Sequence, residues 1–137
     1  MKTTFDTDTI LFSLLRNSPV DAAINGGIYI GDDRPNDSEK EDIVVNSINL
    51  TQDYLPQIGT SNVNIFVPDM NVKINGKQQL KANKIRLKEL LAMTMQTLRE
   101  AKITGLMLIL ESQNVLAEPS IKQHFVNIRI NWNIQTD

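Results

Sequence analysis

The residues of this chain best suited to chemistry are the carboxylates between positions 31 and 42. The segment contains Asp32, Asp33, Asp37, Glu39, Glu41 and Asp42, balanced only by Arg34 and Lys40. Carboxylate oxygens that converge can hold a divalent metal ion, which would suit a metal-dependent nuclease. The spacing matches no calcium-binding loop and no rigid glycine pattern accompanies it. We therefore interpret the segment as a mobile, solvated surface loop, and predict no metal.

The other reactive residue types are sparse. His124 is the single histidine, and no serine or acidic motif accompanies it as a general base would require. The chain has no cysteine, which excludes disulfides and thiolate zinc sites. It also lacks a glycine-rich phosphate-binding motif. We predict no catalytic residue and no cofactor, and expect a protein that is not an enzyme.

A basic segment follows in the middle of the chain. Lys73, Lys77 and Lys81 surround an Asn75-Gly76 pair, the strongest short signal for a β-hairpin, so residues 71–81 are predicted to form a projecting arm. The net charge is −2 and no aromatic residues interleave with the lysines, so specific nucleic-acid binding is not expected. The basic run continues through Lys84, Arg86 and Lys88, so an acidic stretch near 32–42 and a basic stretch near 73–88 carry opposite charges, which favours pairing between copies of the chain.

The clearest structural signal is the alternation of residues 124–134. Val126, Ile128, Ile130, Trp132 and Ile134 fall on one side of a strand, and Asn127, Arg129, Asn131 and Asn133 fall on the other. Side chains on a strand point to alternate faces, so this pattern predicts one buried face and one polar face. Because the polar face is mostly uncharged amides, it suits a hydrogen-bonding contact surface better than a catalytic pocket.

The remaining elements position these segments. We predict a helix from about residue 7 to Asn17-Ser18-Pro19, short strands at 28–30 and 43–50, a strand at 62–67 after a connection at 52–60, and a helix over 82–101. A long hairpin over 105–135 closes the chain. The continuous apolar run 106–110 predicts a central strand covered on both faces, with Met107 and Trp132 in the core. The fold class is α+β: an antiparallel or mixed sheet with two helices on one face, in one domain over residues 1–137.

The order of these elements resembles that of the tail-completion or tail-terminator proteins of long-tailed bacteriophages and prophages. The resemblance covers nearly the whole chain. It includes the first helix ending near Asn17-Ser18-Pro19, the turn into Gly27-Ile28-Tyr29, the long helix and the closing strand Phe125–Ile130. It implies an α+β protein that forms a ring, typically a hexamer. Such a ring stops polymerisation of the tail tube and presents a surface to the head connector.

The resulting hypothesis is a structural tail protein that acts without chemistry. Its expected partners are copies of itself, the tail tube protein and the head–tail connector protein, and no membrane. Its expected location is the bacterial cytoplasm during assembly and then the virion tail. The predicted contact residues are Asp32, Asp33 and Asp37 in the loop, Lys73, Lys77 and Lys81 in the arm, and Asn127, Arg129 and Asn131 on the strand. The alternatives are another head–tail joining or tail-assembly protein, a metal-dependent nuclease, or a small-molecule-binding α+β module.

Overall fold

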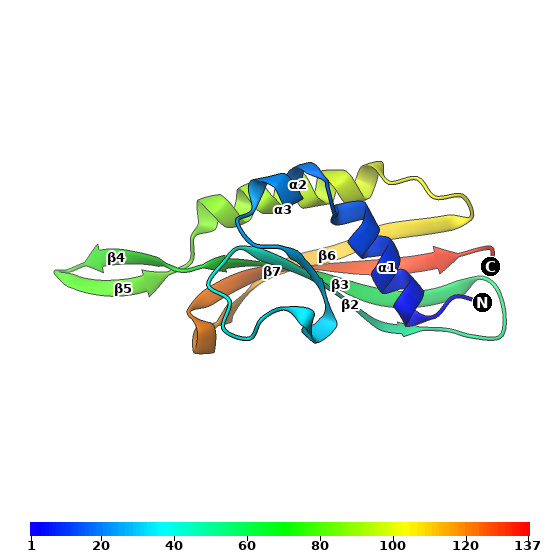
Figure 1. Cartoon of the computed structure of the whole chain (residues 1–137), viewed down its shortest axis with the longest axis horizontal. Helices are drawn as coiled ribbons and strands as arrows, with labels where there is room; N and C mark the ends of the chain where they lie inside the picture. The colour runs from blue at the N-terminus through cyan, green and yellow to red at the C-terminus, as the bar shows by residue number, and fades with distance from the viewer.

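The structure is a computed structural model that describes residues 1–137. Its centre is a five-stranded sheet in the order β1-β2-β3-β7-β6, and a separate two-stranded sheet is formed by β4 and β5. Three helices accompany the sheets (Figure 1). The elements are α1 (Thr4–Leu15), α2 (Pro19–Ala23), β1 (Ile28–Ile30), the 3-10 turn η1 (Gly31–Asp33), β2 (Asp42–Leu50), β3 (Gln57–Pro68), β4 (Met70–Ile74), β5 (Lys77–Lys81), α3 (Lys84–Glu100), β6 (Leu106–Glu118), the 3-10 turn η2 (Pro119–Ile121) and β7 (Gln123–Ile134).

The predicted α+β class is confirmed. Neighbouring strands in the series β2, β3, β7 and β6 pair antiparallel, and only β1 pairs parallel, to β2. The closing hairpin is present as β6 and β7, joined through η2. Strand β3 is longer than predicted, because it begins at Gln57 inside the segment expected to be a connection. Pairing with β7 explains this extension. Gln57 pairs with Ile134, so the long β7 provides backbone hydrogen bonds that the sequence of residues 57–61 does not predict by itself.

The core lies between the sheet and the helices. The predicted apolar face of β7 is buried along its full length, from Val126 to Ile134. Helix α3 turns the stripe Leu87, Leu90, Thr94 and Leu98 toward it, at the three- and four-residue spacing that keeps side chains on one helical face. Helix α1 contributes Leu11 and Leu15 to the same cluster. The helices therefore cover one face of the sheet and leave the other without a helical layer.

A chain of hydrogen bonds crosses this core. The Trp132 Nε1 atom donates to Ser61 Oγ over 2.7 Å, Ser61 Oγ lies 2.7 Å from Ser47 Oγ, and Ser47 Oγ lies 2.6 Å from Thr7 Oγ1. Thr7 in turn donates to the carbonyl of Thr4 over 3.0 Å. Because the indole can only donate and the carbonyl can only accept, the three hydroxyls all donate in the same direction. The chain connects β7, β3 and β2 to α1.

The N-terminus of α1 is held by a hydrogen bond from the backbone of its N-cap residue to a side chain in the first turn. Its N-cap residue is Thr3, and the backbone N–H of Thr3 donates to Asp6 Oδ2 over 2.7 Å. That hydrogen bond is the main reason why the pKa of Asp6 lies below its ordinary value. A carboxylate in the first turn also interacts favourably with the positive end of the helix dipole.

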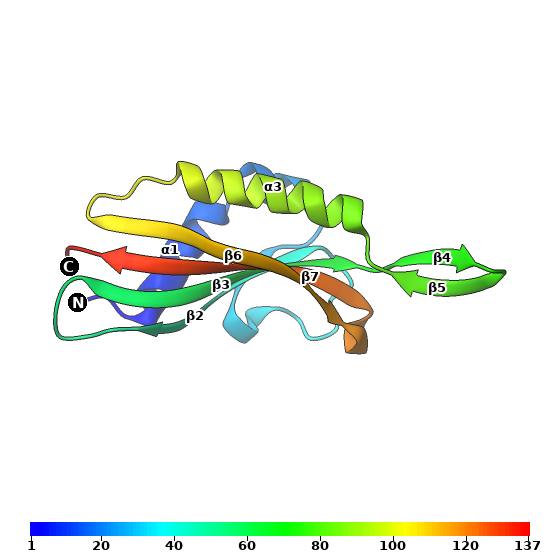
Figure 2. The same ribbon diagram turned by 180° about the vertical axis from the view of Figure 1, so that it is seen from behind.

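The predicted arm is present and projects from one end of the molecule. Strands β4 and β5 pair from Met70↔Lys81 to Ile74↔Lys77. The two residues of the turn both have positive φ, at 52° for Asn75 and 77° for Gly76, as the tight turn of a right-twisted hairpin requires. The arm extends away from the helices and the main sheet in both views (Figures 1 and 2).

Candidate interaction surfaces

The face of the main sheet opposite the helices carries mostly amide side chains. We call it the open face. Asn127 and Asn131 are half-buried there and Arg129 is exposed, so all three predicted residues of β7 lie on this surface. Strand pairing places Asn64 and Asn62 of β3 beside Asn127 and Arg129. The amide of Asn127 donates to Asn64 Oδ1 over 2.8 Å and to Asn62 Oδ1 over 3.1 Å.

The amides continue across neighbouring strands in rows. One row runs Val44, Asn64, Asn127, Asn114 from β2 to β6, and the next runs Asn46, Asn62, Arg129, Ser112. Side chains directly opposite one another on antiparallel strands share a face and lie within contact distance. The open face is therefore a broad hydrogen-bonding surface with a single charged residue, Arg129, in these two rows.

Strand β6 lies at the edge of the sheet, which corrects the prediction of a central strand. It pairs only with β7, and none of its residues is buried. Met107, expected in the core, is 56% exposed, and Ile109 is 43% exposed. Both point to the open face, opposite Asn133 and Asn131. A continuous apolar run is typical of a covered strand, but here the apolar side chains that no helix covers are free for contact.

An uncovered edge of this kind is unusual. Apart from Leu106, which bridges to Ile103, its outer side presents backbone N–H and C=O groups that pair with no other strand, as far as Glu118. In soluble proteins such edge strands are usually short or carry charged residues, because an exposed edge can pair with a strand of another molecule. Strand β6 has only Glu111 and Glu118 as charged residues. The other edge of the sheet, β1, is blunted to Ile28–Ile30 and leads directly into η1.

The three lysines predicted in the arm are all exposed, but they do not share a face. Cross-strand pairs on a ribbon point the same way, so Lys77 lies on the same face as Ile74, and Lys81 on the same face as Met70. Lys73 alternates with these residues along β4 and lies on the opposite face with Gln78. The arm thus has one face with an apolar row beside a basic row.

The acidic loop divides into exposed and engaged carboxylates. Asp32, Asp33 and Asp37 are exposed and form no ion pair. Asp42, in contrast, is only 1% exposed and pairs with Arg34, with 2.8 Å between Arg34 Nε and Asp42 Oδ2. The side chain of Arg34 is only 10% exposed, so each of these buried charges needs the other as its counter-charge.

Further hydrogen bonds anchor this ion pair to the body of the protein. Asp42 Oδ1 accepts from the backbone N–H of Gly27 over 2.8 Å, and Asp42 Oδ2 accepts from Ser38 Oγ over 2.5 Å. The Arg34 guanidinium also donates to Gln123 Oε1 of β7 over 2.8 Å. Its carbon Cζ lies 4.2 Å from the centre of the Phe66 ring, within range of a cation–π interaction. The loop is thereby held against the open face.

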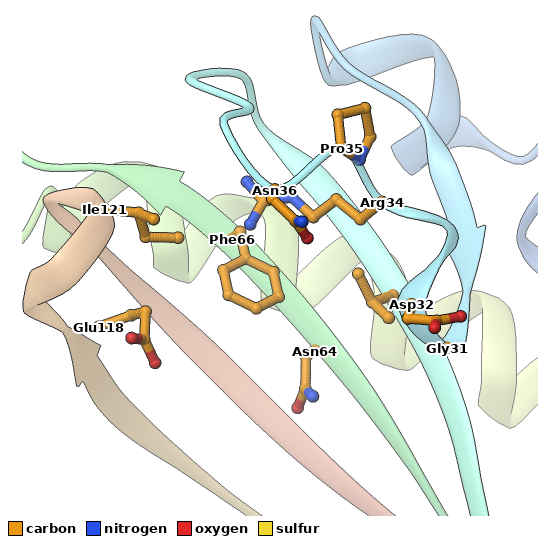
Figure 3. A pocket seen from close by; sticks show the side chains of 10 residues that line it. Gly31, Asp32, Arg34, Pro35, Asn36, Asn64, Phe66, Glu118 and Ile121 are labelled. Carbon is orange, nitrogen blue, oxygen red and sulfur yellow. The ribbon is translucent and has the colours of Figure 1, made fainter.

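These contacts form a hollow on the open face (Figure 3). Its volume is about 290 Å³. Phe66 and Val44 come from the sheet and Ile121 from η2, and together they supply its apolar lining. Asp32 lies on one side of the hollow and Glu118 on the opposite side, as Figure 3 shows. The Phe66 ring also stacks on Phe125 of β7, with 4.8 Å between ring centres.

A second ion pair joins the acidic and basic segments within one chain. The guanidinium of Arg86 donates to both oxygens of Glu41, over 2.7 and 2.9 Å, and to the carbonyl of Ala23 over 2.6 Å. The hydrogen bonds with Glu41 are the main cause that raises the pKa of Arg86 above its ordinary value. Part of the charge complementarity predicted between copies is therefore satisfied inside one molecule. The loop acids 32, 33 and 37 and the arm lysines take no part in it.

Two further features bear on the alternatives of a reactive site and of a small-molecule site. His124 Nδ1 lies 2.6 Å from Asp69 Oδ1, a contact between β7 and the residue that precedes the arm. No group of three or more histidine, cysteine, aspartate or glutamate side chains could hold a metal ion. An apolar groove of about 360 Å³ lies between α3 and β6, lined by Leu87, Leu91 and Val115. Because Val115 is itself exposed, the groove is open at the edge of the sheet.

Several residues of these surfaces were not predicted. Phe66, Glu118 and Ile121 come together only because the loop, β3 and η2 meet on the open face. The polar positions of β3 carried a usable signal, since Asn62 and Asn64 alternate with buried residues in the same way as β7. The exposure of the apolar residues Met107 and Ile109 on β6 had no local signal.

No family model matches the chain, and no curated protein matches it significantly. No helix is both long and apolar enough to cross a membrane.

Proposed function

We propose that this chain is a structural protein of a phage or prophage tail, which works without catalysing a reaction. In this proposal its copies form a ring that caps the tail tube and joins it to the head connector. The observation that carries the proposal is the uncovered edge of β6 beside the amide-rich open face. Together they give a large surface suited to protein contacts and poorly suited to chemistry. The resemblance of the element order to that of tail-terminator proteins is the reason for placing this assembly in a phage tail.

The described surface is better suited to protein contacts than to catalysis. A catalytic site needs titratable groups that converge in a water-excluding cavity. Here the exposed acids of the loop stand singly in solvent and the single histidine is tied to Asp69. A protein interface needs area, apolar anchors and hydrogen-bonding groups. Met107 and Ile109 supply apolar anchors beside the amides Asn131 and Asn133.

A ring can stop polymerisation by geometry alone. Copies that join through two different patches form a closed ring when the rotation between neighbours divides a full turn. One face of the ring then binds the end of the tube. The other face offers the connector a surface that a further tube subunit cannot use. The two rows of mostly amide side chains on the open face suit such a contact, because they bind through hydrogen bonds and Arg129 is the one charge among them that a contact would have to desolvate.

The proposal is tested by removing the protein from its phage or prophage. Without it, electron microscopy should show filled heads separated from tails, and tails of irregular length, because nothing would end the tube. Complementation with the wild-type chain should restore joined particles. Joined particles with tails of uniform length in the absence of the protein would refute the proposal. Separated heads with tails of normal length would instead favour the alternative of a head–tail joining protein.

A further inference from the structure

The tip of the arm presents one apolar and one basic side chain together. Ile74 and Lys77 are directly opposed across the last pair of the ribbon, so they lie side by side on the same face. Both are exposed, and Lys77 forms no ion pair. The opposite face of the same ribbon carries Lys73, which makes a natural comparison. The tip is therefore a small knob with an apolar and a positively charged part.

The hollow on the open face has the complementary chemistry. Its lining is apolar at Phe66, Val44 and Ile121, and carboxylates flank it at Asp32 and Glu118. Asp32 is exposed without an ion-pair partner, and one oxygen of Glu118 accepts from Ser120 over 2.7 Å, which leaves its second oxygen free.

One cation also lines the hollow. Arg34 would repel a lysine, but its guanidinium is paired with the buried carboxylate of Asp42. The charged side chains of the lining that have no ion-pair partner are therefore Asp32 and Glu118. A lysine whose stem packs against the apolar lining while its ammonium meets carboxylates uses both of its chemical parts.

The arm cannot fill the hollow of its own chain. It continues directly from the end of β3 and points away from the body, as both views show (Figures 1 and 2). Its paired strands of five residues place the tip roughly 15 Å beyond the end of the main sheet. A knob and a hollow on different parts of one molecule can meet only between two molecules. Such a contact is head-to-tail, so it repeats from one copy to the next.

We propose that the arm tip of one copy, with Ile74 and Lys77, docks into the hollow between Asp32 and Glu118 of a second copy. This contact gives the ring its subunit interface. The inference rests on the proposed self-assembly, but not on the location of the assembly in a phage tail. A failure of the gene-removal experiment would therefore leave it standing, and a failure of the experiment below would leave the tail assignment standing.

Cysteine cross-linking tests the contact directly, because the chain has no cysteine of its own. Lys77→Cys and Asp32→Cys chains are prepared separately, mixed and oxidised under mild conditions. We expect a disulfide-linked dimer of the two different chains. Lys73→Cys mixed with Asp32→Cys is the matched control, because Lys73 is on the same arm but faces away. It should give at least tenfold less cross-linked product.

Charge reversal provides an independent measurement on freely associating protein. Lys77→Glu should weaken self-association about tenfold or more, measured by sedimentation at low salt, whereas Lys73→Glu should change it less than about threefold. Combining Lys77→Glu with Asp32→Lys and Glu118→Lys should restore association. Circular dichroism verifies that each variant is folded. Equal cross-linking from positions 77 and 73, no cross-link from either, or association insensitive to Lys77→Glu would overturn the inference and assign the hollow to a different occupant.

Discussion

Replacing Asp42 by asparagine should strongly destabilise the protein and release the loop that builds the hollow. The substitution keeps the shape of the side chain but removes its charge. The carboxylate accepts hydrogen bonds from Gly27, Arg34 and Ser38. The NH₂ group of an asparagine cannot accept, so at least one of these three donors would face another donor. Arg34 would also be left at 10% exposure without its counter-charge. Removing one partner of such a buried pair typically costs about 3 kcal/mol or more.

This cost translates into a measurable change in melting temperature. With an unfolding entropy of roughly 2.1 cal/mol/K per residue, a loss of about 3 kcal/mol in a chain of this size lowers the midpoint by about 10 °C. Thermal and urea denaturation followed by circular dichroism would measure it. Asp37→Asn is the control, because Asp37 is an exposed acid of the same loop without an ion pair. A midpoint for Asp42→Asn within about 2 °C of the wild type would refute the claim that this ion pair fixes the loop.

Three further outcomes follow from the same structure. Trp132→Phe removes the donor to the buried Ser61 hydroxyl and part of the indole volume, so urea denaturation should show a loss of about 2 kcal/mol; an unchanged midpoint would contradict the hydrogen-bond chain. Ile109→Lys should leave the free energy of unfolding within about 0.5 kcal/mol of the wild type in urea denaturation, because Ile109 is 43% exposed; a loss of more than about 1 kcal/mol would contradict the exposure of this side chain on β6. The pKa of Asp6 is lower in the folded state, so its contribution is full at neutral pH and is lost as the pH falls through that value; Asp6→Asn should therefore flatten the loss of stability in acid, and an unchanged acid limb would argue against it.

The elements that the sequence predicts well are those with a strong local period. The alternation of β7 specifies both its buried face and its amide face, and the stripe of α3 specifies the side that meets the sheet. The Asn75-Gly76 pair predicts the arm because both residues accept positive φ. In each case the signal and the structure that it specifies lie within the same few residues.

What the sequence cannot supply is the pairing of distant segments. The run Leu106–Leu110 is apolar in the way of a covered strand, and only the strand order shows that β6 has a neighbour on one side. The acids of the loop look equivalent in the sequence. Asp42 is nevertheless buried against Arg34, while Asp32 remains exposed, because burial depends on how the loop folds back over Phe66. The arm lysines likewise separate into two faces only once the hairpin register is known.

The central claim is that copies of this chain join head-to-tail through two different patches. Native mass spectrometry of two complementary variants tests it most directly. An arm variant, Ile74→Ser with Lys77→Ser, keeps its hollow, and a hollow variant, Asp32→Lys with Glu118→Lys, keeps its arm. Each alone should remain monomeric where the wild type assembles, and a mixture should form a one-to-one dimer that grows no further, because only one intact contact can be made. Assemblies of wild-type size from either variant alone, or a mixture that stays monomeric, would contradict the account.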